Sequence, residues 1–148
     1  MKLRRGSPTK GLEFDLEFPE GLNVYRDVPG VDLIVSAGDQ HHPAATVITI
    51  GATREGGPVT REEHVRRVRE NTAELDPHLV DEGPIPLAGL ESWWTIDAIV
   101  LGGRSLVLER WMLVRDGVGW TASVRMPWLD MHKFRDGTIA IVSTLRFR

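Results

Sequence analysis

Hydrophobic and polar residues alternate along much of this chain, a pattern typical of β-strands with one buried face. The first segment to do so, residues 12–18, alternates apolar with acidic side chains without interruption. The pattern predicts further strands over 22–26, 31–37 and 45–53. Because Pro and Gly mark turns between these segments, we expect short connections and antiparallel pairing.

The strongest β pattern lies in the C-terminal half, over residues 90–101, 105–115 and 118–126. Glycine-containing turns at 102–104 and 116–117 join these segments, which predicts a three-stranded antiparallel meander. Alternation turns Trp94 and Trp120 toward the main core. In the middle strand it turns four apolar side chains the same way: Leu106, Leu108, Met112 and Val114.

Two segments have helical signals. Thr60 and Glu63 match a capping box, and apolar residues follow at helical spacing until Asp76 and Pro77 end the helix. Near the C-terminus, Asp136 is the expected cap of a second helix that continues to about residue 143.

Length and composition predict one α+β domain. The chain has 148 residues, of which 41% are hydrophobic and 26% charged, which is ample for a single core. We expect a flexible tail over residues 1–10 and one domain over 11–148. No apolar run is long enough to span a membrane. The basic N-terminus lacks the apolar segment of a secretory signal, so we expect a cytoplasmic protein; the alternative is an exported protein whose signal segment has been removed.

Composition and motifs exclude several kinds of chemistry. The chain has no cysteine, so thiol catalysis, thiolate metal sites and disulfides are absent. A formal net charge of −3 argues against nucleic-acid binding. No nucleophile elbow or phosphate-binding loop is present. We therefore expect no cofactor and no catalytic residue with a recognisable signature.

The second face of the meander carries the most informative residues. If Trp94 points inward, Trp93, Thr95 and Asp97 point to the opposite face. The pattern places Glu109 and Trp111 there too, with Thr121, Ser123 and Arg125 from the third strand. Aromatic anchors with a few charges suit a binding surface. The candidate binding residues are therefore Trp93, Thr95, Asp97, Glu109, Trp111 and Arg125.

Other interpretations of these residues stay open. Glu109 and Arg125 could form a cross-strand ion pair while a helix covers the tryptophans. Asp97 and Glu109 could instead act as acid and base. Elsewhere, Asp39, His41 and His42 are weak candidates for metal ligation, because a loop could let them converge; solvated side chains are the simpler interpretation.

The order of several short motifs resembles the Mog/PsbP superfamily, with the bacterial DcrB and LpqN-type proteins nearest. These motifs are Phe18-Pro19-Glu20-Gly21, Leu87-Ala88-Gly89-Leu90 and the closing Ser143-Thr144-Leu145-Arg146-Phe147. One departure is Leu22, where members usually have an aromatic residue. The resemblance implies an antiparallel sheet with helices on its faces, an α/β/α sandwich. It implies no single activity, since relatives have unrelated roles.

The sequence thus favours a non-catalytic binding module that docks a protein partner or an apolar segment on its tryptophan-bearing sheet face. One alternative is a carrier of a small ligand or metal, and another is a cryptic hydrolase. A homodimer through an exposed strand edge is also compatible with an open sheet.

Overall fold

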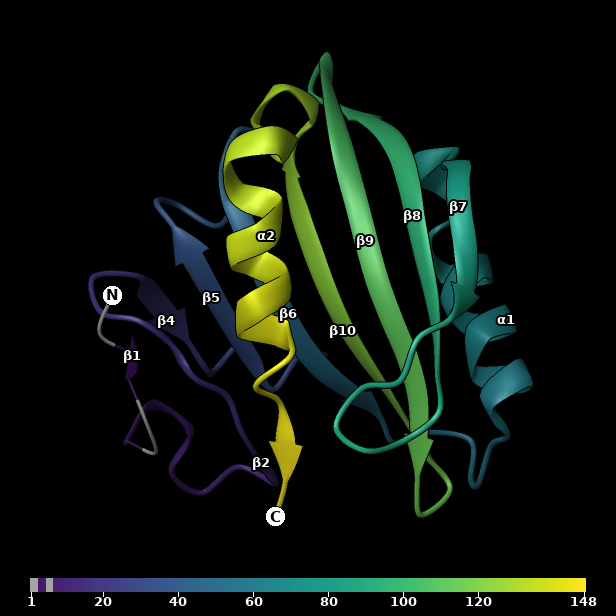
Figure 1. Ribbon diagram of the computed structural model, residues 1–148. Coiled ribbons are helices and arrows are strands. Elements are labelled where there is room, and N and C mark those ends of the chain that lie inside the picture. The colour runs from purple at the N-terminus through teal and green to yellow at the C-terminus, as the bar shows by residue number, and fades with distance from the viewer. Residues whose placement is uncertain (1–2, 5–6) are drawn as a thin grey trace.

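The computed structural model describes residues 3–4 and 7–148 and is built on one antiparallel sheet (Figure 1). Each neighbouring pair of its strands is antiparallel. In spatial order the strands are β4 (Asn23–Tyr25), β5 (Leu33–Ala37), β6 (Thr46–Thr53), β10 (Val118–Pro127), β9 (Arg104–Arg115), β8 (Ser92–Leu101) and β7 (His78–Pro84). The predicted three-stranded meander is therefore confirmed as β8, β9 and β10.

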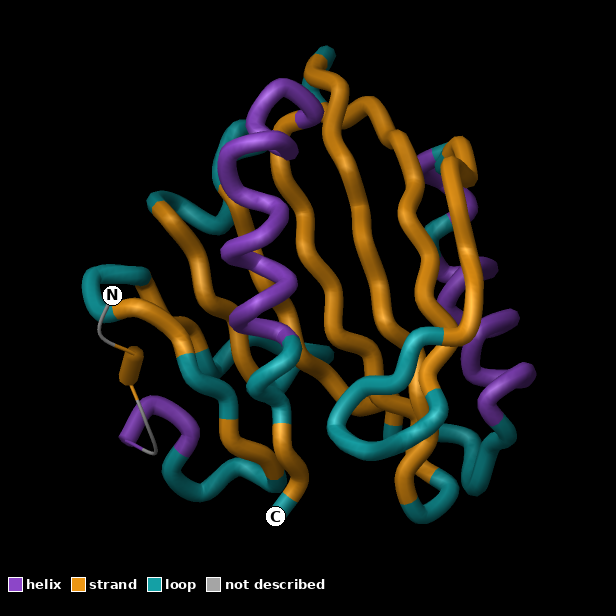
Figure 2. Tube along the Cα trace, viewed as in Figure 1, coloured by secondary structure: helices purple, strands orange, loops and turns teal. Residues whose placement is uncertain are grey.

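A helix lies on each face of this sheet (Figures 1 and 2). Helix α2 (Met131–Val142) crosses one face, and α1 (Arg61–Asn71) packs on β8 and β9 from the other. We call these the α2 face and the α1 face. The remaining elements are short: β1 (Leu3–Arg4), η1 (Ser7–Thr9), β2 (Phe14–Asp15), β3 (Phe18–Pro19), η2 (Ala73–Leu75), η3 (Trp128–Asp130) and β11 (Arg146–Phe147). The α+β architecture expected from the sequence is confirmed.

The main core lies on the α2 face and is centred on an aromatic cluster. Trp120 meets the rings of Phe14 and Phe147 edge-on, with centroids 5.7 and 5.0 Å away. These two phenylalanines pair across β2 and β11, so segments from both ends of the chain cover the same tryptophan. Edge-to-face pairs of this kind add stabilisation beyond their buried area.

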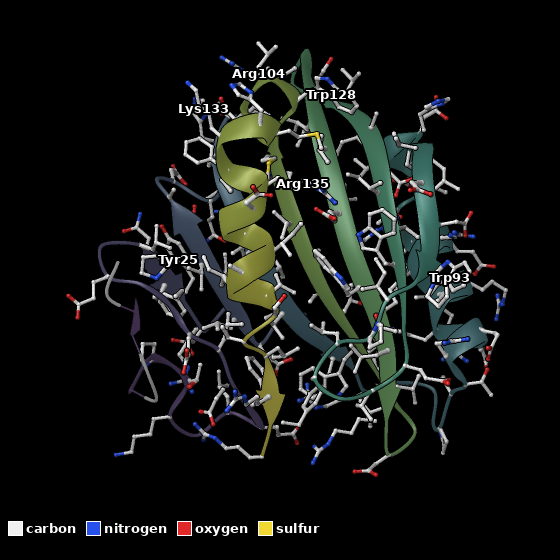
Figure 3. The ribbon with its side chains drawn as sticks, viewed as in Figure 1. Tyr25, Trp93, Arg104, Trp128, Lys133 and Arg135 are labelled. Carbon is white, nitrogen blue, oxygen red and sulfur yellow. The ribbon has the colours of Figure 1, made fainter. Side chains whose placement is uncertain are left out.

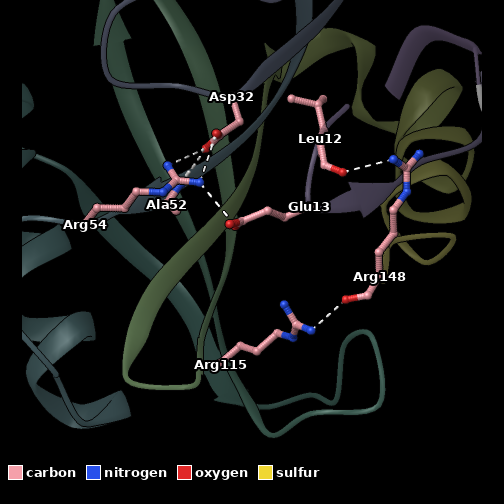
Figure 4. Close-up of polar contacts among 7 residues, drawn as sticks. All are labelled: Leu12, Glu13, Asp32, Ala52, Arg54, Arg115 and Arg148. Atoms are coloured by element: carbon pink, nitrogen blue, oxygen red, sulfur yellow. Dashed lines mark hydrogen bonds and ion pairs between the residues drawn. The ribbon is translucent and has the colours of Figure 1, made fainter. Parts of the chain in front are cut away.

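Arginines fasten these end segments to the sheet (Figure 4). The Arg54 guanidinium lies 5.4 Å from the Trp120 ring centroid and binds both Asp32 and Glu13. Arg148 donates from Nη1 to the carbonyl of Leu12 over 3.0 Å. The C-terminus therefore closes over the N-terminal segment instead of extending the main sheet.

The N-terminal expectations meet the structure only in part. Alternation over residues 12–18 is real, since Phe14, Leu16 and Phe18 are buried. The segment forms only the short strands β2 and β3, which pair outside the main sheet. The flexible tail over 1–10 stays a prediction, because residues 1–2 and 5–6 lie outside the described residues. Within it, β1 pairs with β3, and Ser7–Thr9 forms η1.

The predicted cap of the first helix is confirmed, whereas the predicted cap of the second helix is wrong. Thr60 caps α1, its Oγ accepting from the Glu63 amide over 3.2 Å. The second helix begins at Met131, ahead of the predicted cap Asp136. Strand β7 was not expected: only Gly83 is partly covered, so no alternation marks the strand. Its pairing with β8 also shifts register between Leu79 and Asp81, as in a β-bulge.

The predicted orientation of β9 is wrong, and the cause is a single turn residue. Leu101 pairs with Arg104, so the turn holds only the two glycines between them, both with positive φ. A two-residue turn places Trp94 directly opposite Trp111, and Glu109 shares that face. A one-residue shift reverses every side chain of a strand. The same shift moves to the α1 face Leu106, Leu108, Met112 and Val114.

Helix α1 is seated on the sheet by a buried histidine. His64 is 1% exposed, and its Nε2 donates to the carbonyl of Trp120 over 2.9 Å. The imidazole lies against Gly119, where a β-carbon would come within 2.2 Å of its Nδ1. Glycine at 119 is thus a steric requirement for the contact between helix and strand.

Substituting Gly119→Ala should therefore destabilise the fold by about 1–3 kcal/mol, as overpacking of a well-filled site does. Gly83→Ala is a matched control, since a β-carbon there meets nothing within 4 Å. Urea unfolding of both variants checks this. Equal stability of the two variants would show that the imidazole is not confined.

Acid should also weaken the fold through His64, whose pKa burial lowers. The unfolded chain then protonates more readily, so unfolding takes up a proton as the pH falls below about 6.5. The stabilisation that the buried neutral imidazole of His64 provides is fully present above that pH and is lost on acidification. In His64→Gln, the unfolding free energy should fall less between pH 7 and about 5. The exposed His132, changed to Gln, is the matched control, because it removes a histidine that is not buried between a helix and the sheet.

Candidate binding surfaces on the two faces of the sheet

The six candidate residues do not form one surface. Trp93, Thr95 and Asp97 on β8 lie on the α1 face together with Arg125 on β10. Glu109 and Trp111 lie on the α2 face, opposite to the prediction, because of the turn described above. The two groups are separated by the sheet itself.

On the α1 face, Asp97 belongs to a buried ion pair that the sequence analysis missed. Arg110 Nη2 lies 3.1 Å from Asp97 Oδ2, and the two side chains are 4% and 6% exposed. Arg110 Nη1 also donates to Thr72 at the end of α1 over 2.9 Å. Burial lowers the pKa of Arg110, and the Asp97 carboxylate opposes that effect. The pair thus ties α1 to the sheet.

Trp93 is only half-buried, at the border between α1 and β7 (Figure 3). Its indole Nε1 donates to Glu82 Oε1 over 3.0 Å, and Arg69 donates to the same oxygen over 2.7 Å. The Arg69 bond, followed by that from Trp93, lowers the pKa of Glu82. A hollow of about 290 Å³ opens here beside Val65. Trp93 is thus accessible, with its indole nitrogen already bonded.

On the α2 face, Glu109 is a fully buried carboxylate. Its Oε2 accepts from Trp94 Nε1 over 2.7 Å and from Arg135 Nη2 over 2.9 Å. Arg135 comes from α2, and the hydrogen bond to Glu109 raises the pKa of Arg135. Trp111 is 5% exposed on this face. Neither residue presents an anchor to solvent, and the charge instead joins α2 to β9.

Two further interpretations of the sequence are wrong for the same reason. Asp97 and Glu109 point to opposite faces, so they cannot act on one substrate as acid and base. Glu109 and Arg125 likewise do not pair. Arg125 instead donates from Nη2 to the carbonyls of Gln40 and His42, over 2.9 and 3.3 Å.

The candidate metal ligands form part of the loop that Arg125 holds. Asp39 Oδ1 accepts from the His41 amide over 2.9 Å, and His42 Nδ1 accepts from the Ala44 amide over 3.0 Å. Among the described residues, no three His, Asp or Glu side chains are placed to share an ion. Two of the three candidate side chains thus bond to the backbone of the loop itself.

An apolar opening lies on the α2 face, between α2 and strands β5 and β6. The sequence analysis missed it, because its walls come from segments more than a hundred residues apart. It encloses about 250 Å³ and is lined by Pro19, Leu22, Val35, Ala37, Thr46, Ile48, Lys133, Phe134, Gly137, Thr138 and Ile141. We call it the α2 groove. Among the described residues that line it, Lys133 alone is charged, and Figure 3 shows it near the start of α2.

Exposed apolar side chains occur in helix α2 and just before it. Phe134, which lines the α2 groove, is 48% exposed. Just before α2 along the chain, Trp128 and Leu129 are 43% and 82% exposed. An exposed aromatic side chain at the border of an apolar recess, as Phe134 is here, indicates an interaction surface.

Known structures share this architecture. A Pseudomonas aeruginosa protein of unknown function superposes with a TM-score of 0.65 at 19% identity, over 100% of this chain and 97% of that chain. PsbP (CyanoP) from Synechocystis sp. PCC 6803 superposes with a TM-score of 0.63 at 14% identity, over 99% of this chain and 92% of that chain. LpqN of Mycobacterium tuberculosis, which is involved in cell envelope biogenesis, superposes with a TM-score of 0.57 at 12% identity, over 98% of this chain and 90% of that chain.

The chain has a PsbP-like fold. The predicted resemblance to PsbP and LpqN-type proteins is thus confirmed at the level of the fold. A Bacteroides thetaiotaomicron structure also matches, with a TM-score of 0.62 and 14% identity; the match covers 92% of this chain but only 45% of that one. The sequence itself matches no protein-family model and no curated protein. In the described part of this PsbP-like chain, no helix has the length and apolar character needed to cross a membrane.

The Glu109–Arg135 ion pair should contribute more to the free energy of unfolding than the distance between its nitrogen and oxygen atoms suggests. The substitution Arg135→Met leaves the buried Glu109 carboxylate with only the Trp94 indole as a partner. The free energy of unfolding should fall by about 1–3 kcal/mol. This is less than for a wholly buried pair, because Arg135 is 34% exposed. The Arg66–Glu70 pair is shorter, at 2.7 Å, but exposed. Arg66→Met should therefore cost under about 0.5 kcal/mol.

Denaturant unfolding measures both effects. Adding Glu109→Gln to Arg135→Met should restore part of the lost stability, because it removes the stranded charge. If the double variant were less stable than Arg135→Met alone, Glu109 would not depend on Arg135.

Proposed function

We propose that this protein is a non-catalytic binding module whose α2 groove docks an apolar segment of a partner protein. The observation that carries the proposal is the groove itself, an open apolar recess bordered by the half-exposed Phe134. An apolar side chain entering it would bury surface that now faces water, which is favourable by about 25 cal/mol per Å².

Charge narrows the kind of segment that fits. Lys133 is exposed and is the one charged side chain among the described residues that line the groove. An acidic residue flanking the apolar segment could pair with it and fix the orientation of the segment. The partner we propose is therefore a protein segment with consecutive apolar residues next to a carboxylate.

The proposed binding surface is the α2 groove, which differs from the tryptophan-bearing face predicted from the sequence. Docking on a face shared by Trp93 and Trp111 is not possible, since the two residues lie on opposite sides of the sheet. A non-catalytic role gains support from the separation of Asp97 and Glu109, which removes the acid–base pair of the hydrolase alternative. A small apolar ligand in the same groove remains the carrier alternative, and the experiment below distinguishes it.

Cellular location and assembly state stay predictions. We expect a cytoplasmic protein, although LpqN, which shares the fold, is described in cell envelope biogenesis. Homodimerisation through a strand edge is likewise an expectation from the open sheet.

Site-specific photocrosslinking tests the groove directly. With Phe134 replaced by p-benzoylphenylalanine, irradiation of living cells should link the protein to a polypeptide through an apolar segment with an acidic neighbour. The same analogue at Val100, which is 65% exposed and outside the groove lining, is the matched control. A synthetic peptide of the linked segment should then bind in calorimetry.

Variants of the groove should separate docking from a chance contact. Leu22→Glu should weaken peptide binding at least about tenfold, equivalent to about 1.4 kcal/mol, because it places a charge in an apolar wall. Val100→Glu should leave binding unchanged. Crosslinks to lipid or small molecules alone would support the carrier alternative, and equal polypeptide crosslinking at 134 and 100 would contradict docking in the groove.

A further inference from the structure

The segment Trp128–Asp130 has the composition that the α2 groove requires of its occupant. It forms η3 just before α2 and carries two consecutive apolar side chains, Trp128 and Leu129, followed by a carboxylate. The two apolar side chains are 43% and 82% exposed, and Leu129 is the most exposed large apolar side chain among the described residues. The segment thus presents apolar surface that the protein's own core leaves uncovered.

The charges of the segment and the groove are complementary. Lys133 is the charged residue of the groove lining, and Asp130 ends η3 without a capping bond from its side chain to α2. Within the part of the chain that the structure describes, neither residue forms an ion pair. Asp136 also lies on α2, but it does not line the groove, and its charge interacts with that of Arg135. An ion pair between Asp130 and Lys133 of two different chains would fix how one lies on the other.

The segment and the groove adjoin each other in the fold. η3 packs against α2, and α2 forms one wall of the groove. Figure 3 shows Trp128 and Lys133 at the same end of α2. Leu129 does not enter the groove of its own chain, since it is exposed and is not part of the lining. A surface that carries both a segment and its receptor is self-complementary, because a two-fold axis beside the first turn of α2 brings each η3 to the groove of the other copy.

One other exposed segment has a similar composition, Leu79-Val80-Asp81 in β7. Its two apolar side chains are 42% and 51% exposed, less than Leu129. β7 forms one border of the main sheet, and β5 lies next to the other border. Insertion of β7 into the groove would join two different surfaces of the two copies, and such a contact continues from copy to copy instead of closing on a pair. η3 is therefore the favoured segment.

We propose that a second copy of this chain occupies the α2 groove when no partner is bound. Each copy places Trp128 and Leu129 beside Phe134 of the other and pairs its Asp130 with the other copy's Lys133. The inference rests on the proposed function, because it requires a groove that accepts an apolar segment. The dimer covers both grooves, so a partner segment has to compete with self-association.

The size of the contact sets the strength of this dimer. Interfaces that bury less than about 1,200 Å² in total are typical of weak, transient complexes. One three-residue segment from each copy makes a small contact, which the two-fold symmetry repeats. We therefore expect a reversible dimer that a tighter-binding partner segment displaces.

Sedimentation velocity over a concentration series tests the dimer. The parent protein should pass from monomer to dimer as its concentration rises. Lys133→Glu and Asp130→Lys should each weaken dimerisation at least about tenfold, because each places like charges across both contacts. Asp81→Lys is the matched control and should dimerise like the parent, since β7 lies outside the contact. Circular dichroism should show the parent fold in each variant.

A mixture of the two charge variants separates contact between copies from a local effect on α2. When Lys133→Glu and Asp130→Lys are mixed in equal amounts, opposite charges again meet at both contacts. The charges within each chain are the same as before mixing. The mixture should therefore dimerise like the parent, although neither variant does so alone. Mixing cannot repair a defect in the folding of one chain.

Leu129→Ser distinguishes self-association from partner docking. The substitution removes the inserted segment and leaves the groove intact, so the variant should stay monomeric. It should bind the peptide identified by crosslinking at Phe134 at least as tightly as the parent does, because no second copy competes for the groove. Weaker binding of the peptide to this variant would contradict competition between the dimer and a partner.

Three further results would overturn the proposal. They are a parent protein that is still monomeric at about 1 mM, an equal mixture of the two charge variants that stays monomeric, and a loss of the dimer in Asp81→Lys. A monomeric parent that still binds the crosslinked peptide would refute self-association alone. A dimer that forms as described, with crosslinks from Phe134 only to this same chain, would refute docking of another protein and leave self-association standing.

Discussion

The register between β8 and β9 is the constraint on which the rest of the structure depends. Two consecutive glycines with positive φ close the turn, and only a two-residue turn places Trp94 opposite Trp111. That pairing sends Glu109 to the α2 face and Arg110 to the α1 face. Each helix then finds one charged partner on the strand between them.

The two charged contacts have different surroundings but a common effect. Arg110 is buried with Asp97 and reaches the end of α1, whereas Glu109 is buried and meets the partly exposed Arg135 of α2. In both, a charge in the interior constrains where a helix can lie, since any other position strands it without a partner. This accounts for the burial of β9 on both faces between Leu106 and Leu113, where only Leu108 is half-buried, although this stretch carries two charged residues, Glu109 and Arg110.

Sequence patterns predicted those parts of the fold in which one face is dry and the other wet. Alternation over 118–126 is such a case and agrees with the structure. The capping box at Thr60 is a local signal at the start of a helix, and it agrees too. Alternation failed in β9, where apolar residues occupy both faces and the period carries no information. There the turn length was the better guide, and counting Arg104 as a turn residue reversed the strand.

The candidate sites were less predictable than the fold. The face of Arg125 followed from alternation, but its partners are carbonyls of a loop some eighty residues earlier. The α2 groove joins Leu22 to Phe134, and no local pattern connects positions so far apart. Strand β7 was hidden for the opposite reason: it is exposed on both sides, so it resembles a loop in the sequence.

That exposed strand also bears on how the molecule behaves at high concentration. The bulge between Leu79 and Asp81 interrupts the regular row of amide and carbonyl groups along the outer border of the sheet, and Pro84 ends it without a donor. A neighbouring chain cannot continue the ladder in step past such a break. Of the two outer strands of the described main sheet, β7 is the longer, and this break makes it a poor template for stacking into fibrils, whereas β4 at the other border has no such bulge.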